Sequence, residues 1–142
     1  MAQIHLEVVT PSGPVVSEDV DIVTAPGTNG EFGVLANHAP FLSTVKTGVL
    51  HYKKDKEVKY LMVSGGFAEV SENSVTFLVE IADFGNEIDV PRALRAKERA
   101  EKRLAQGQAH DEKVSRIRAT AALERSLARI AAAERCKLNR QQ

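Results

Sequence analysis

Residues 74–105 read SVTFLVEIADFGNEIDVPRALRAKERAEKRLA, and this stretch changes its hydrophobic period halfway along. Its first part alternates apolar and polar residues, as a half-buried strand does. The apolar positions are Val75, Phe77, Val79 and Ile81. From Asp89 onward the stretch has no glycine and no aromatic residue, and its alanines recur at helical spacing. We therefore expect a strand module to end near residue 87 and a helical module to begin at residue 88.

The residues before this boundary indicate a series of short strands. Apolar residues alternate with polar ones in two further runs: Ile4, Leu6 and Val8, and then Val20 and Ile22. The run 59–64 is apolar on both faces, as a central strand would be. Turn signals separate these runs at 11–14, 26–30, 54–56 and 72–73. Residues 1–87 are therefore predicted to form an antiparallel β-sandwich or barrel.

The residues after the boundary indicate two helices. Asp89 is the predicted N-cap of the first helix, and Pro91 falls in its first turn, where a missing N–H costs little. Residues 107–110 break the pattern, and Asp111 is the predicted cap of a second helix that runs to about Ala133. The spacing predicts these buried stripes: Ala93, Ala96, Ala100 and Leu104; Val114, Ile117 and Ala121; Leu123, Leu127 and Ile130. The fold class is thus α+β, with an antiparallel two-helix hairpin over residues 88–142 after the sandwich.

Alanine is the commonest residue of these predicted stripes, at four of the ten positions. Burial stabilises by roughly 25 cal/mol per Å² of apolar area, so a buried alanine contributes far less than a leucine. We expect the hairpin to be weakly held, and to open or dock elsewhere at a cost of a few kcal/mol.

The charge of the chain is divided between the two modules. Residues 1–87 hold 12 Asp and Glu against 5 Lys and Arg, a net charge of −7. Residues 88–142 hold 7 Asp and Glu against 14 Lys and Arg, a net charge of +7. This split predicts two modules that face different partners. No apolar run approaches the ~20 residues of a membrane span, and the start resembles neither a signal sequence nor a transit peptide, so we expect a cytoplasmic protein without membrane insertion.

No catalytic or metal-binding pattern is present. The sequence lacks a phosphate-binding P-loop and a Gly-x-Ser-x-Gly elbow, and its four histidines lack metal-ligand spacing. The single cysteine, Cys136, excludes an internal disulfide and a cysteine-based metal cluster. We therefore predict a non-catalytic chain with no metal site and no required cofactor.

Arginines follow one ridge of each predicted helix. They are Arg92, Arg95, Arg99 and Arg103 on the first helix, and Arg118, Arg125 and Arg129 on the second. Three interpretations remain open: a solvated surface, a dock for an acidic protein surface, or a phosphate-binding fork. Nucleic acid is disfavoured because no aromatic residue follows Phe84 and the strand module is acidic.

Four segments resemble the epsilon subunits of bacterial F-type ATP synthases. The first is PGTNGEFGVLANHAP at 26–40, and the second and third are GGFAEV at 65–70 and VTFL at 75–78. The fourth, IDVPRA at 88–93, is similar to the Ile-Asp-x-x-Arg-Ala motif at the start of that family's hairpin. The four segments come in the family's order, and the resemblance covers essentially the whole chain.

The resemblance implies a non-catalytic rotor subunit on the cytoplasmic face of the cell membrane. Its sandwich would bind the gamma subunit and sit on the c-ring, and its mobile hairpin would extend to the alpha/beta catalytic head and inhibit ATP hydrolysis. Glu31 and His38 match residues that face the c-ring in the family. A mitochondrial counterpart would normally need a transit peptide, whereas a chloroplast epsilon subunit would not.

In some family members the hairpin binds ATP, which makes ATP a candidate regulatory ligand here. The matching positions are Ile88, Asp89, Arg92, Ala93, Arg99, Arg125 and Arg129. Pro91 occupies a variable position of the motif and is expected to stiffen the entry to the helix. The alternative function is an ATP sensor in which nucleotide capture by the hairpin is the main activity.

Overall fold

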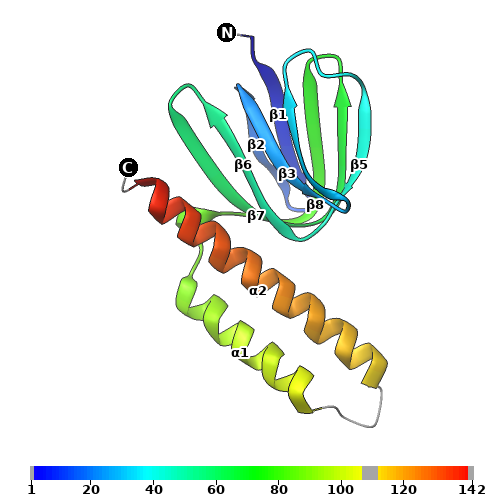
Figure 1. Cartoon of the computed structure of the whole chain (residues 1–142), viewed down its shortest axis with the longest axis vertical. Helices are drawn as coiled ribbons and strands as arrows, with labels where there is room; N and C mark the ends of the chain where they lie inside the picture. Colours follow the sequence, from blue (N-terminus) through cyan, green and yellow to red (C-terminus); the bar gives the residue numbers. More distant parts are fainter. Residues whose placement is uncertain (1, 107–111, 141–142) are drawn as a thin grey trace.

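A computed structural model describes residues 2–106 and 112–140 of the chain. Figure 1 shows the strands gathered in one body and two helices beneath it, with α2 lying between α1 and the strands. The strands of the described residues are β1 (Ile4–Thr10), β2 (Gly13–Val20), β3 (Ile22–Gly27), β4 (Gly30–Leu35), β5 (Phe41–Val45), β6 (Gly48–Lys54), β7 (Glu57–Ser71) and β8 (Ser74–Phe84). A short 3₁₀ turn, η1 (Gly85–Glu87), leads into helix α1 (Val90–Gln106), and helix α2 (Glu112–Arg140) follows. The predicted order of a β-sandwich and then two helices is confirmed.

The strands pair in the order β2-β1-β8-β7-β5-β3-β4, and β6 pairs with both β3 and β7. Among the described strands, β1 and β8 run parallel, with Leu6 opposite Val75, whereas the other pairs are antiparallel. The parallel pair joins the first strand of the chain to the last, so the intervening strands supply the long crossover that a parallel pair needs.

Strand β7 joins two parts of the sandwich. Its first half pairs with β6, as far as Val63 opposite Gly48, and its second half pairs with β5, from Gly66 opposite Val45. Gly65 lies between the two halves with a φ of +48°, a conformation that glycine adopts without steric cost. At Gly66 a Cβ atom would clash with the carbonyl oxygen of Leu78 on β8, so the two backbones approach there as only glycine allows.

The main core lies within residues 4–84. The predicted alternation on β1 is confirmed, since Ile4, Leu6 and Val8 are fully buried. Tyr52 of β6 lies in the same core, and its hydroxyl donates a hydrogen bond to Glu18 Oε2 at 3.3 Å. Burial, and then the neighbouring Glu18 carboxylate, raise the pKa of Tyr52, so this side chain stays a neutral donor.

A second, smaller apolar cluster lies between the sandwich and α2. It consists of Met62 of β7 with Ala128 and Ala132 of α2, and Val49, Ile81 and Ile88 pack against it. Leu61 and Val63, which alternate with Met62, point into the main core instead. The predicted two-sided burial is confirmed for 61–64, because α2 covers the outer face of β7 there, whereas Lys59 is exposed and Tyr60 is partly buried.

The buried stripe of α2 differs from the prediction. The buried positions on this helix are Ala119, Ser126, Ala128 and Ala132, whereas Val114, Ile117 and Leu127 are exposed. The prediction was wrong because it assigned the larger apolar residues to the interface. Helix α2 must approach both α1 and the sheet, and short side chains permit that approach. The helix also continues to Arg140, beyond the predicted end at Ala133.

The hairpin connection at 107–110 and the predicted cap Asp111 lie outside the described residues. On the first helix, Ala93 and Ala100 are buried as predicted, whereas Ala96 and Leu104 of the predicted stripe are only partly buried. Neither of the two helices, over the residues described, combines the length and the hydrophobicity that a membrane crossing requires.

Candidate functional site

A cleft of about 460 Å³ lies where the sandwich leads into the hairpin. Its lining comes from β8, η1, α1 and α2, and the lining residues are Asp83, Glu87, Ile88, Asp89, Arg92, Ala93, Ala96, Arg99 and Arg129. The structure thus brings together all the residues of the predicted nucleotide set except Arg125. That residue lies one turn before Arg129 on α2, is half-buried, and does not line the cleft.

Two residues of the predicted set also hold the fold. Asp89 caps helix α1, because its Oδ1 accepts a hydrogen bond from the backbone N–H of Arg92 at 3.1 Å. The backbone N–H of Ala93 donates to the Asp89 carbonyl at 3.0 Å, which closes the first turn. Ile88 packs against the small apolar cluster under α2. Substitution of either Asp89 or Ile88 would therefore disturb the hairpin as well as the cleft.

An ion pair crosses the cleft from the sandwich to the hairpin. Arg129 Nε on α2 donates to Asp83 Oδ2 on β8 at 3.1 Å, with both side chains partly exposed. The lining carries three carboxylates and three guanidinium groups, so its formal charges balance. Arg129 uses its Nε–H in this pair and has four further N–H donors, so an anionic ligand could share Arg129 with Asp83 but would lie beside a carboxylate that repels it. The sequence-based prediction missed Asp83, whose partner Arg129 lies 46 residues away, and Glu87, which directly precedes the motif at 88–93.

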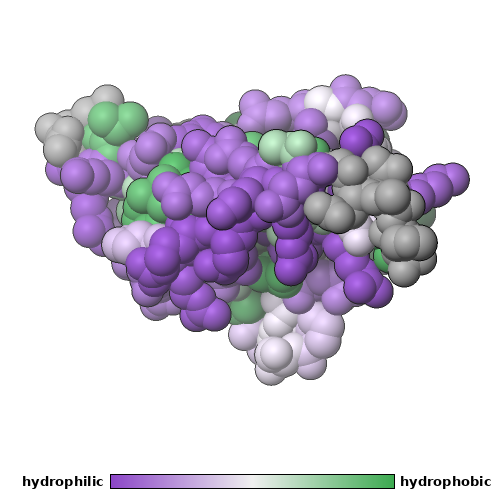
Figure 2. Space-filling view, turned by 90° about the horizontal axis from the view of Figure 1, so that it is seen from below, coloured by the Kyte–Doolittle hydropathy of each residue, from purple (hydrophilic) through white to green (hydrophobic). Residues whose placement is uncertain are grey.

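The arginine ridge of α1 faces solvent. Arg92, Arg95, Arg99 and Arg103 are all exposed. Figure 2 views the molecule from below, where the two helices lie, and hydrophilic side chains dominate that face with only small separate apolar patches. The exposed ridge leaves its cations available to an anionic surface, and two of them, Arg92 and Arg99, also line the cleft.

Glu31 and His38 lie at the two ends of strand β4. Glu31 is exposed, opposite Pro26 and next to the β3–β4 turn. His38 lies beyond the other end of β4 and is half-exposed, with Nδ1 2.7 Å from the Ala39 carbonyl oxygen and its ring 5.9 Å from that of Phe41. Phe41 connects this part of the chain, because its ring also lies 5.5 Å from that of Phe32, the residue after Glu31.

An apolar row on the outer face of the sandwich was not predicted. We define it as Leu42 of β5, Phe67 of β7 and Leu78 of β8, which are 72%, 56% and 53% exposed. Phe67 is directly opposite Leu78, and Leu42 is diagonal to Phe67, because Thr44 is the residue opposite Phe67. Adjacent exposed apolar side chains on three strands indicate a protein contact surface. The sequence hid this row, since its members come from three separate strands.

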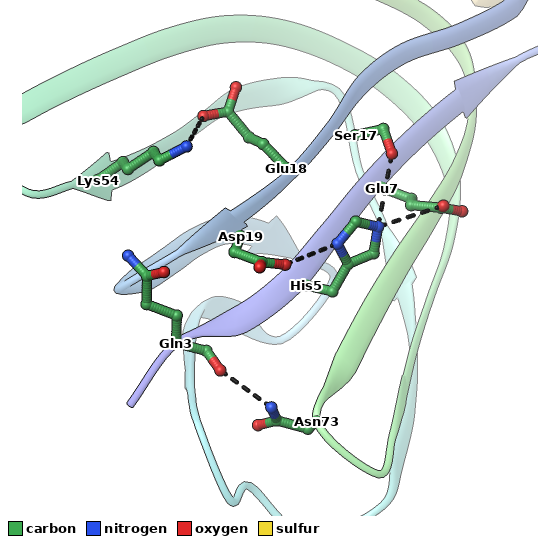
Figure 3. Close-up of polar contacts among 8 residues, drawn as sticks. All are labelled: Gln3, His5, Glu7, Ser17, Glu18, Asp19, Lys54 and Asn73. Carbon is green, nitrogen blue, oxygen red and sulfur yellow. Dashed lines mark hydrogen bonds and ion pairs between the residues drawn. The ribbon is translucent and has the colours of Figure 1, made fainter. Parts of the chain in front are cut away.

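A serine, a histidine and an aspartate meet on the outer face of β1 and β2 (Figure 3). His5 Nδ1 lies 2.8 Å from Asp19 Oδ1, and its Nε2 lies 3.4 Å from both Ser17 Oγ and Glu7 Oε1. The order resembles a hydrolytic triad, but Glu7 competes for the same nitrogen and the group stands on an open strand surface. The hydrogen bond between His5 and Asp19 is the main reason that the pKa of His5 is raised, and burial of the ring opposes this shift. The arrangement is a surface ion-pair cluster.

Metal ligands do not gather elsewhere in the described part of the chain. Over residues 2–106 and 112–140, no three His, Cys, Asp or Glu side chains come together in a way that could hold a metal ion.

Comparison with known proteins identifies the family. Residues 3–85 match the family model described as ATP synthase, Delta/Epsilon chain, beta-sandwich domain, and residues 86–134 match the one described as ATP synthase, Delta/Epsilon chain, long alpha-helix domain. The ATP synthase epsilon chain of Nitratidesulfovibrio vulgaris (strain DP4) is 55% identical over 89% of this chain and 92% of its own length. That of Desulfitobacterium hafniense (strain Y51) is 48% identical over 90% of this chain and 94% of its own.

A solved structure agrees with the fold at similar coverage. A chain in the structure of the Euglena gracilis mitochondrial ATP synthase, OSCP/F1/c-ring, superposes with a TM-score of 0.80 at 30% identity. The match covers 93% of this chain and 82% of that one. The relatives are non-catalytic subunits, in agreement with the prediction that this chain is not a stand-alone enzyme. On its sandwich, its long helices and its close relatives, the chain belongs to the ATP synthase delta/epsilon family.

Proposed function

We propose that this chain is a central-stalk rotor subunit that couples c-ring rotation to the catalytic head of a proton-translocating F-type ATP synthase. The observation that carries the proposal is the apolar row, an exposed contact surface on a sandwich whose fold matches a chain of an F1/c-ring structure. The high identity to bacterial epsilon chains supports a place on the cytoplasmic face of a bacterial cell membrane.

The apolar row is the proposed contact for the gamma subunit. Phe67 lies at its centre, flanked across the strands by Leu78 and diagonally by Leu42. A buried aromatic anchor ringed by smaller contacts is typical of the energetic centre of a protein interface. The row would bind a complementary apolar surface, and the charged strand positions around it would form the polar rim.

Glu31 and His38 are the proposed c-ring contacts. Both are accessible, which a partner contact requires. Phe41 packs against both His38 and Phe32, the residue next to Glu31, and would lie between the two proposed contacts.

The hairpin is the proposed brake on ATP hydrolysis. Residues 88–142 carry a net charge of +7, and the arginine ridge of α1 is exposed. The hairpin could therefore bind an acidic surface on the alpha/beta head. On the helix side of the small apolar cluster the buried residues are Ala128 and Ala132, so release of α2 would expose little apolar surface of the helix, although it would uncover Met62 of β7. These features suit an element with two positions.

ATP is the proposed regulatory ligand of the cleft. Arg92, Arg99 and Arg129 converge there, and guanidinium groups suit phosphate oxygens. Phosphate at Arg129 would compete with the Asp83 carboxylate for the guanidinium group, and binding would thereby alter a contact that joins the hairpin to the sandwich. In the alternative function this sensing is the main activity.

The coupling and braking roles are tested with the cognate catalytic head, comparing the full chain with a version that ends at Glu87. We expect both to bind and only the full chain to inhibit ATP hydrolysis. Equal effects of the two would overturn the brake, and failure of both to bind would overturn the rotor assignment. Phe67→Asp in the full chain should abolish binding to gamma, whereas Glu72→Ala, in the exposed β7–β8 turn, should not.

The nucleotide role is tested by equilibrium binding of ATP to the isolated chain. Arg92→Gln with Arg99→Gln should reduce the affinity at least tenfold, since two charge-assisted contacts are lost. Arg103→Gln is the matched control, because Arg103 lies on the same ridge but outside the cleft. Equal effects of the two changes would show non-specific attraction to a basic helix.

A further inference from the structure

Three side chains from three elements meet at the edge of the contact between α2 and the sandwich. The guanidinium carbon of Arg135 on α2 lies 5.0 Å from the ring centroid of Tyr60 on β7. Arg135 Nη2 lies 3.4 Å from Nδ1 of His51 on β6, and the His51 and Tyr60 rings are 5.6 Å apart. His51 and Tyr60 are opposite each other across the β6–β7 pair. One arginine of the hairpin thus rests on two neighbouring rings of the sandwich.

This contact fixes the protonation state of His51. A guanidinium group only donates, so Nδ1 of His51 must accept and the imidazole must be neutral. A proton on Nδ1 would remove the hydrogen bond and place two cations side by side. The stacking of Arg135 on Tyr60 persists in either state, because the ring attracts the cation through its electron-rich face.

The other groups around His51 do not reverse this preference. Thr24 is opposite His51 on β3, and it carries no charge. Lys53 lies two residues along β6, on the same face, and adds positive charge. Glu31 of β4 favours the protonated form, but burial first and then Arg135 outweigh it and lower the pKa of His51.

We propose that His51, Tyr60 and Arg135 form a latch that holds α2 against the sandwich at neutral pH and releases it on acidification. The latch lies beyond the apolar contact of Met62 with Ala128 and Ala132, on the C-terminal side of α2. The latch adds to that apolar contact and to the Arg129–Asp83 pair, which also join α2 to the sandwich. The proposal concerns docking within this chain alone and does not depend on the brake.

The direction of the pH effect on docking follows from the coupling between docking and protonation of His51. In the docked state the pKa of His51 is below its ordinary value of 6.5, and in the released state it returns toward that value. The released state therefore binds more protons as the pH falls through 6.5, and docking weakens. Between pH 7.5 and 5.5 the docking equilibrium can fall by up to about tenfold, the limit reached if docked His51 takes no proton at pH 5.5.

The test measures amide hydrogen exchange of α2 in the isolated full-length chain at pH 7.5 and 5.5, corrected for intrinsic rates. We expect α2 of the wild type to lose several-fold more protection on acidification than α2 of His51→Gln. His38→Gln is the matched control, since it removes a histidine outside this interface and should behave as the wild type does. Equal losses in wild type and His51→Gln would overturn the proposal.

A second pair of variants separates the two contacts of Arg135. Arg135→Gln should lower the protection of α2 already at pH 7.5 and should reduce its pH dependence, because the opposing charge is gone. Tyr60→Phe keeps the ring and should retain both protection and pH dependence, whereas Tyr60→Ala should lose protection at both pH values. If Arg135→Gln left α2 fully protected with unchanged pH dependence, Arg135 would have no part in the latch.

Discussion

Arg129 on helix α2 donates a hydrogen bond to Asp83 on strand β8 at 3.1 Å, across 46 residues of sequence. This pair fastens the hairpin to the sandwich beside the cleft. Within the described residues, Arg129 is the one arginine of α2 that lines the cleft, and its Nε is engaged by Asp83.

The pair should contribute modestly to the docked state. Both side chains are partly exposed, so we expect a coupling free energy of about 0.2–1 kcal/mol. Urea unfolding of Asp83→Asn, Arg129→Gln and the double variant gives this value as a double-mutant cycle. Additive single effects would show that the pair does not contribute, and 0.5 M salt should shrink a genuine coupling.

The sandwich should fold without the hairpin. All buried residues of the main core lie within residues 4–84, so a chain that ends at Glu87 keeps every one of them. We expect sheet-type circular dichroism and a cooperative thermal transition, with lower stability because Met62 and Ile81 lose their cover. An unfolded fragment would contradict the predicted boundary at residue 87.

The close approach at Gly66 should be intolerant of a side chain. Gly66→Ala would drive a Cβ atom into the Leu78 carbonyl oxygen, and we expect a loss of about 1–3 kcal/mol in the free energy of unfolding. Gly33→Ala is the matched control in another strand, because its Cβ would meet Ile22 Cδ1 at an ordinary 3.8 Å. Chemical denaturation of both variants gives the two free energies of unfolding. If Gly66→Ala were as stable as Gly33→Ala, the expected clash would be contradicted.

The surface cluster at His5 should give a small pH dependence of stability. The folded pKa of His5 is raised, chiefly by Asp19, so its contribution is present below pH 6.5 and is lost as the pH rises through the folded value. Relative to His5→Gln, the wild type should be more stable at pH 5.5 than at pH 8.5. Asp19→Asn should reduce this difference, and a difference of opposite sign would refute the assignment.

Local pattern was enough to predict most of the fold. The period-two runs at Ile4–Val8 and Val75–Ile81 and the cap at Asp89 depend on neighbours in sequence, and the structure shows each of them. The buried stripe of α2 was mispredicted because this helix packs against both α1 and the sheet, and the positions buried by the two contacts hold small residues. Hydrophobicity alone therefore predicts that Ile117 is buried in preference to Ala119, although the structure buries the alanine and exposes the isoleucine.

The sequence predicted only those parts of the candidate site whose residues lie close together along the chain. The motif at residues 88–93 and the arginines of the ridge were named from sequence, and the cleft contains most of them. Asp83, the apolar row and the His51–Arg135 contact are each made by residues far apart in the chain. Only the pairing of strands and the course of α2 bring them together.

Strand β7 carries a mechanical consequence. Met62, under the hairpin, and Phe67, at the centre of the apolar row, are separated by five positions on one continuous strand. Gly65, with its positive φ, lies between them, next to the tight approach of Gly66 to β8. A force that a partner applies at Phe67 would thus reach the contact of Met62 with α2 along a strand that pairs with β8 on both sides of Gly65.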